Sequence, residues 1–149
     1  MSRLLDLLSI CVVVLGFGMS VPQNANRQDF IAALTAKANT GDVTSQMDLA
    51  FRYMNGNGLK NDETKAAGWF RKAADKGDPI AQDMLGVDYE FGRPFTQDYV
   101  QAFFWYSKAA QQGYAEAQNN LGALYDAGNG VRQDHEQAAV WYQIGRAHV

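Results

Sequence analysis

An internal repeat of 36 residues is the feature that most constrains how this chain can fold. Six kinds of residue recur in one register with no insertion between the copies. A fixed period of this size is typical of stacked units, each of which is one supersecondary structure. The repeated columns are Trp69, Trp105 and Trp141; Tyr53, Tyr89 and Tyr125; Gln46, Gln82 and Gln118; Gly41, Gly77 and Gly113; Asp62, Asp98 and Asp134; and Ala66, Ala102 and Ala138.

The second half of each unit has the spacing of an amphipathic helix. Apolar residues at i, i+3, i+4, i+7 and i+8 form one stripe, as in Ala66, Trp69, Phe70, Ala73 and Ala74. The aspartate column stands where a carboxylate can accept from the free N–H groups of the first turn. Glycines follow the last turn, as a left-handed C-terminal cap requires. The spacing therefore predicts a helix of about 14 residues, with the Trp and Tyr columns in the core.

The first half of each unit predicts a second helix. Gln82, Leu85, Gly86 and Tyr89 lie at i, i+3, i+4 and i+7, and Asp78-Pro79 forms an N-cap and first-turn pair. A glycine inside a helix costs roughly 1 kcal/mol relative to alanine. Because a glycine recurs at this position in the next unit, we expect a neighbouring helix to approach closely there.

The two helices of a unit are joined by turns that contain Gly56-Asn57-Gly58 and Gly128-Asn129-Gly130. Glycine supplies the positive φ values that such turns need. The middle unit has Gly92-Arg93-Pro94 instead, and proline cannot adopt a positive φ. We therefore expect the middle turn to follow a different path at the same length.

These elements predict an all-α fold, an α/α superhelix in the form of a right-handed solenoid of helix-turn-helix repeats. An N-terminal half-repeat helix is expected at 27–40. Repeat 1 is expected at 41–76, repeat 2 at 77–112 and an incomplete repeat 3 at 113–143.

The N-terminal segment has the layout of a secretory signal peptide. Arg3 precedes an almost uncharged run from Leu7 to Val21, and small and polar residues follow. The run is short for a membrane span, which needs about 20 apolar residues. We therefore predict a signal peptide at 1–25, cleaved after Ser20 or Ala25, and a periplasmic or secreted protein. An uncleaved anchor and a buried helix are the alternatives, and only the anchor would place the protein in contact with a membrane.

The C-terminal residues depart from the repeat. The pattern requires two alanines near 145 and 146, but the chain has Ile144-Gly145-Arg146-Ala147-His148-Val149. A DNA sequence resembling sequencing-adapter read-through can encode these six residues. We expect 144–149 to be a non-native tail and the native protein to continue with more repeats.

Composition and motifs point away from catalysis. A formal charge of −3 without any basic block excludes the electrostatic footprint of a nucleic-acid partner. The single cysteine excludes a disulfide framework, and no catalytic, phosphate-binding or dinucleotide motif is present.

The individual candidate residues also argue against a catalytic or metal site. His135 is expected to be solvated. Asp83 and Asp88 are about 140° apart on a helix, so they are not expected to share a site. The sequence therefore predicts no enzyme, no metal site and no cofactor.

The third unit carries nearly all of a known motif. Its residues are Ala117, Leu121, Gly122, Tyr125, Gly128, Gly130, Val131, Asp134, Ala138, Trp141 and Tyr142. The chain from about 27 to 143 resembles the Sel-1-like repeat family, a relative of the tetratricopeptide repeats. The resemblance implies an α/α superhelix that acts as an adaptor or scaffold, and many bacterial members are secreted or periplasmic.

The resemblance also implies that the first helix of each unit lines a concave surface. We expect a protein or peptide partner to bind there, at residues that differ between units: Asp48, Phe51, Arg52, Asp83, Val87, Asp88, Asn119, Asn120 and Ala123. Two alternatives remain. One is a cell-wall hydrolase or β-lactam-binding enzyme, and the other is a structural spacer within a longer repeat array.

Overall fold

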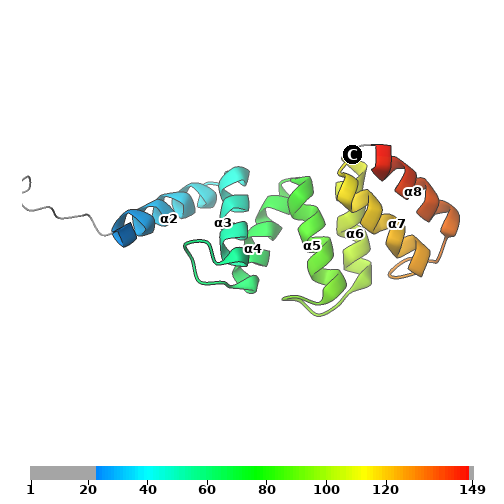
Figure 1. Cartoon of the computed structure of the whole chain (residues 1–149), viewed down its shortest axis with the longest axis horizontal. Coiled ribbons are helices and arrows are strands. Elements are labelled where there is room, and N and C mark those ends of the chain that lie inside the picture. The colour runs from blue at the N-terminus through cyan, green and yellow to red at the C-terminus, as the bar shows by residue number, and fades with distance from the viewer. Residues whose placement is uncertain (1–22, 148–149) are drawn as a thin grey trace, which may run out of the picture. The chain divides into compact units, whose positions relative to one another are not determined.

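The computed structural model describes residues 23–147 (Figure 1). This part of the chain consists of α-helices, with no strand. The helices are α2 (Gln23–Asn39), α3 (Val43–Asn55), α4 (Glu63–Asp75), α5 (Pro79–Phe91), α6 (Tyr99–Gln111), α7 (Ala115–Ala127) and α8 (His135–Ala147). The predicted signal peptide falls mostly on residues 1–22, which lie outside the described part.

The chain divides into two units between Ala33 and Leu34. Of the first unit, the structure describes the N-terminal part of α2. The second unit contains the rest of α2 and the helices α3 to α8. The helix expected at 27–40 corresponds to α2, which begins at Gln23 and ends at Asn39. The tail expected at 144–149 enters the last turn of α8, and residues 148 and 149 lie outside the described part.

Within the second unit, successive helices pack against one another in chain order. The contacts join α3 to α4, α5 to α6 and α7 to α8 as helix pairs, and α4 to α5 and α6 to α7 as junctions between pairs. Figure 1 shows α5 and α6 side by side as one such pair. This arrangement confirms the predicted all-α repeat fold, in which each pair buries its apolar stripe against its neighbours.

The predicted caps are present. The carboxylate of Asp62 accepts from the Lys65 N–H at 2.9 Å, and that of Asp98 accepts from the Gln101 N–H at 3.0 Å. Gly77 follows α4 with a φ of 96°, and Gly113 follows α6 with a φ of 87°. These contacts are local, which is why the sequence could predict them.

The three loops within helix pairs, at 56–62, 92–98 and 128–134, have the same length. Each is closed by the same backbone hydrogen bond, as from the Asp98 N–H to the Tyr89 carbonyl at 2.9 Å. The middle loop differs inside this frame, because its Arg93–Pro94 peptide bond is cis where the other loops have a glycine with positive φ. The predicted constant length is confirmed, and the backbone at Pro94 differs from that at Gly58 and Gly130, which have positive φ.

Two hydrophobic clusters form the core. The first gathers Phe70, Leu85 and Trp105, and the second gathers Tyr106, Leu121 and small alanines of α6. Of the repeated tryptophans, Trp105 is 2% exposed, whereas Trp69 and Trp141 are partly buried and pack against the clusters. The repeated tyrosines are likewise partly buried and pack against the clusters. The aromatic columns therefore lie in the core or at its edge.

The glutamine column has a role that the spacing did not reveal. Each side-chain amide donates to a carbonyl near the C-terminal end of the preceding helix. The three bonds run from Gln46 Nε2 to Ala38 O at 3.0 Å, from Gln82 Nε2 to Ala74 O at 3.2 Å and from Gln118 Nε2 to Ala110 O at 3.1 Å. Helix ends leave carbonyls without intrahelical partners, so these buried amides join one repeat to the next.

Candidate interaction surface

The predicted surface residues of α3 are engaged with their own helix pair. Asp48 accepts from Arg52 Nε at 2.7 Å, one helical turn away. The Phe51 ring packs edge-on against Phe70 of α4, with centroids 5.3 Å apart. Phe51 is therefore tied to the first core cluster, while the Asp48–Arg52 pair is partly exposed on the helix surface.

Asp83 of α5 is buried, with 3% of its surface exposed. Its Oδ1 accepts from Asn120 Nδ2 of α7 at 3.0 Å, so two predicted surface residues join successive pairs. Burial raises the pKa of the Asp83 carboxyl to about 6, and the nearby Glu116 and Glu90 add to this increase, whereas the Asn120 hydrogen bond opposes it. This pair contributes to the junction and offers little surface to a partner.

The remaining predicted residues differ in how accessible they are. Ala123 is exposed on α7, and Asn119 is partly buried, with its amide oxygen close to Gly145 of α8. Val87 packs partly against the second core cluster and also lines a pocket. Asp88 lines the same pocket.

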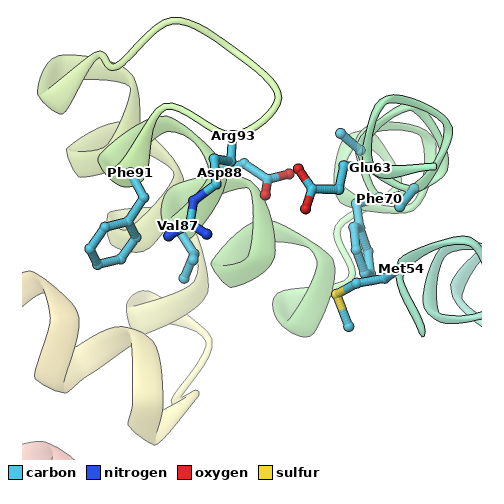
Figure 2. Close-up of a pocket in the computed structure, with 9 residues that line it drawn as sticks. Met54, Glu63, Phe70, Val87, Asp88, Phe91 and Arg93 are labelled. Carbon is cyan, nitrogen blue, oxygen red and sulfur yellow. The ribbon is translucent and has the colours of Figure 1, made fainter. Parts of the chain in front are cut away.

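This pocket, about 360 Å³ in volume, lies where α3, α4 and α5 meet. Met54 of α3, Phe70 of α4 and Val87 of α5 supply apolar walls. Figure 2 shows the carboxylates of Glu63 and Asp88 pointing toward one another. The other lining residues are Ala66, Ala67, Phe91 and Arg93.

The facing carboxylates set the electrostatics of the pocket. Burial raises the pKa of the Asp88 carboxyl to about 7, and the negative charge of Glu63 raises it further. Arg93, from the loop after α5, is exposed at the rim. Among the described residues, no ion pair joins Arg93 to either carboxylate. The pocket therefore combines apolar walls with two carboxylates that no basic side chain of the described residues pairs with.

The sequence analysis predicted Val87 and Asp88 as partner-binding residues of a helix surface, and it did not predict the pocket that they line with Glu63, Met54 and Phe91. The available signal was the register itself, because a residue can be compared with the one 36 positions later. His135 is exposed as expected, and its Nδ1 lies 2.6 Å from Asp126 Oδ1, a pairing that was not foreseen.

Neither a metal-like cluster nor a membrane-spanning helix is found in the described part of the chain. No group of three or more His, Cys, Asp or Glu side chains gathers there. None of the helices within 23–147 is both long and apolar enough to cross a membrane.

The packed helix pairs, uniform loops and repeated inter-pair hydrogen bonds define an all-α helical repeat protein. The Sel1 repeat family model matches residues 43–78, 79–114 and 115–145. The chain therefore belongs to the Sel1 repeat family. Sel1 repeats generally mediate protein–protein interactions, and proteins built from them are typically non-enzymatic scaffolds. No functionally curated protein matches the sequence.

Solved structures of other repeat proteins resemble this one. The Escherichia coli protein c5321, described as a protective antigen of uropathogenic strains with an SLR fold, is 40% identical over 78% of this chain, with a TM-score of 0.75. The match spans 25% of c5321 itself. A Sel1 repeat protein from Oxalobacter formigenes is 40% identical over 78% of this chain and 87% of its own, with a TM-score of 0.72.

A third match is more distant. Helicobacter pylori cysteine-rich protein B is 20% identical over 89% of this chain and 93% of its own, with a TM-score of 0.63. At this identity the likeness shows a shared fold.

Proposed function

We propose that this protein is a scaffold outside the cytoplasm that binds another protein through the outward-facing side chains of α3, α5 and α7. The observation that carries the proposal is the contrast between two sets of positions in a Sel1 repeat array. The core columns recur in register, whereas other positions of these helices differ from repeat to repeat, as at Phe51, Val87 and Ala123. In a stacked array each repeat contacts only its neighbours, so the recurring positions maintain the stack and the extended surface is available for binding.

The extracytoplasmic location is proposed from the N-terminal sequence. A positive start, an apolar run and a small polar segment have the order of a cleaved signal. The mass of the mature protein recovered from a periplasmic fraction tests this directly. A chain that keeps its first 20 residues in the cytoplasmic fraction would contradict it.

The binding surface is tested by cross-linking capture from the periplasmic fraction, with the full chain as bait. The variant Asp48→Arg/Ala123→Arg places bulk and charge on α3 and α7, and the control Ala139→Arg changes an exposed residue of α8. We expect one stoichiometric partner that the wild type and the control retain and the variant loses. Equal capture by all three folded proteins would rule out this surface.

A further inference from the structure

The pocket between α3, α4 and α5 differs from its counterpart one repeat later. Ala67 is replaced there by Phe103, Asp88 by Leu124 and Glu63 by Tyr99. Leu124 is 1% exposed in the second core cluster, and Phe103 packs edge-on against Tyr125 with centroids 5.4 Å apart. At the second junction, large apolar side chains pack against the core. At the first junction, an alanine and two carboxylates leave a pocket.

The acidic pair in this pocket is unfavourable for the folded protein alone. Asp88 occupies the position of a core leucine and faces a second carboxylate across the gap. Burial, and then the negative charge of Glu63, disfavour the ionised form of the Asp88 carboxyl and raise its pKa. Groups kept in an unfavourable environment are more common at functional sites than elsewhere. A bound cation would relieve the repulsion.

The apolar part of the pocket limits what kind of cation fits. Met54, Phe70 and Val87 contact the space beside the carboxylates, and Phe91 stands on the rim with 58% of its surface exposed. A long cationic side chain can lay its methylene stem on such walls and keep its charged head at the acidic end. A guanidinium also donates several hydrogen bonds, which suits two carboxylates better than a metal-like point charge does.

We propose that this pocket binds an arginine side chain, flanked by an apolar residue, from an extended segment of a partner protein. The Asp88 and Glu63 carboxylates receive the guanidinium, and Phe91 covers the flanking apolar side chain. Arg93 at the rim repels the positive charge of the bound arginine. The attraction of the two carboxylates for that arginine must therefore exceed the repulsion from Arg93. This inference rests on the proposed scaffold function, because the occupant belongs to a protein partner.

The test is an NMR titration of the full chain with the peptide acetyl-Leu-Arg-Leu-amide. The comparison peptide carries citrulline in place of arginine, which keeps the shape and removes the charge. We expect saturable shifts at the backbone amides of Ala67, Val87 and Phe91, and at least tenfold weaker binding of the citrulline peptide. Equal binding of the two peptides, or no shifts at these amides, would overturn the proposal.

Two variants separate the pocket from nonspecific attraction. Ala67→Phe/Asp88→Leu rebuilds the residues of the second junction and fills the space, whereas Glu63→Gln/Asp88→Asn keeps the shape and removes the charges. Both variants are expected to bind the arginine peptide at least tenfold more weakly than the wild type. Circular dichroism and thermal unfolding should show that both variants are folded. The control Asp126→Asn/Glu136→Gln removes two exposed carboxylates from α7 and α8 and should bind like the wild type. Binding retained by the filled variant contradicts the proposal.

The pH dependence provides a second readout. Asp88 faces Glu63 of α4, and Arg93 of the following loop lines the same pocket. Burial, and then the hydrogen bond and charge of Glu90, raise the pKa of the Tyr106 hydroxyl of α6, to which the more weakly acting charges of Asp83 and Asp88 add. Because Asp88 must be ionised to receive a cation, affinity should fall several-fold between about pH 8 and about pH 5.5. An affinity that rises on acidification would count against the assigned pair.

The outcomes also distinguish this inference from the scaffold function. If the filled variant still captures the full partner, the scaffold remains and the pocket is not its binding site. If the arginine peptide binds while no protein partner is captured, the pocket chemistry remains and the scaffold function fails.

Discussion

The ring of Tyr106 in α6 lies directly against Gly86 of α5 and leaves no room for a side chain there. A Cβ on Gly86 would come within 3 Å of the ring carbons, and the buried Tyr106 hydroxyl donates to Glu90 Oε2 at 2.7 Å. The next repeat has the same arrangement, where a Cβ on Gly122 would lie 2.9 Å from Tyr142 Cε1. The glycines predicted to allow close approach thus make room for a tyrosine ring of the partner helix.

Gly86→Ala is expected to destabilise the protein by about 1–3 kcal/mol, because the added methyl forces the Tyr106 ring to move in a packed core. Gly68→Ala is the matched control, since nothing lies within 4 Å of its Cβ position on α4. There the alanine should stabilise the helix by about 1 kcal/mol. Urea unfolding of both variants checks the prediction, which fails if the two changes have the same sign.

Gln118→Ala is expected to cost about 1 kcal/mol, because the Ala110 carbonyl loses its side-chain donor in a buried junction and keeps the Gly113 N–H. Gln111→Ala changes an exposed glutamine at the end of α6 and should have little effect. Urea unfolding of the two variants and the wild type measures the difference in the free energy of unfolding. Equal stability would mean that water replaces the lost amide without penalty.

Asp98→Ala is expected to lower stability by about 1 kcal/mol, because the first turn of α6 loses the acceptor of its Val100 and Gln101 N–H groups. Asp98→Ser should recover most of the loss, since a hydroxyl can accept the same bonds. Thermal unfolding provides the measurement. If serine is as harmful as alanine, the cap is not the cause.

Asp83→Asn is expected to change how stability depends on pH. The folded-state pKa of Asp83 is about 6, above its ordinary 3.8, so the folded protein binds more protons than the unfolded chain in this interval. Stability from this group therefore falls as pH rises from about 4 to about 6 and stays low above that. The variant should gain about 1–2 kcal/mol at about pH 8 and almost nothing at about pH 4.

The measurement is urea unfolding of the wild type and Asp83→Asn at several pH values. Asp75→Asn serves as the control, because Asp75 is exposed and pairs with Arg71 on the surface of α4. A variant that gains the same amount at every pH would contradict the assigned ionisation.

Asp88→Leu is expected to stabilise the unliganded protein by about 1 kcal/mol, because it places the residue of the second junction in the first and removes the repulsion from Glu63. Asp126→Leu, on an exposed position of α7, should give no such gain. Thermal unfolding without ligand is the measurement. A loss of stability in Asp88→Leu would mean that the pocket cannot close around a leucine.

The fold was more predictable than the interaction surface. The aspartate caps and the glycine ends depend on residues within a few positions of one another, and the 36-residue register can be seen in the sequence directly. All of them appear as expected. Asp83 was predicted as a surface residue because its position varies between repeats, yet it is buried against Asn120. Variation alone cannot tell an exposed position from a junction whose two sides change together.

The sequence by itself determined the helix pairs, their order and the length of every loop between paired helices, because helix periodicity and capping are local. Only the tertiary structure decided which variable residues meet. Glu63 and Asp88 are 25 positions apart, and their approach depends on how α4 packs on α5. The pocket exists because Ala67 and Asp88 are small or polar at positions where Phe103 and Leu124 fill the next junction. Burial of a side chain depends on the sizes of its neighbours across the junction, which no local pattern contains.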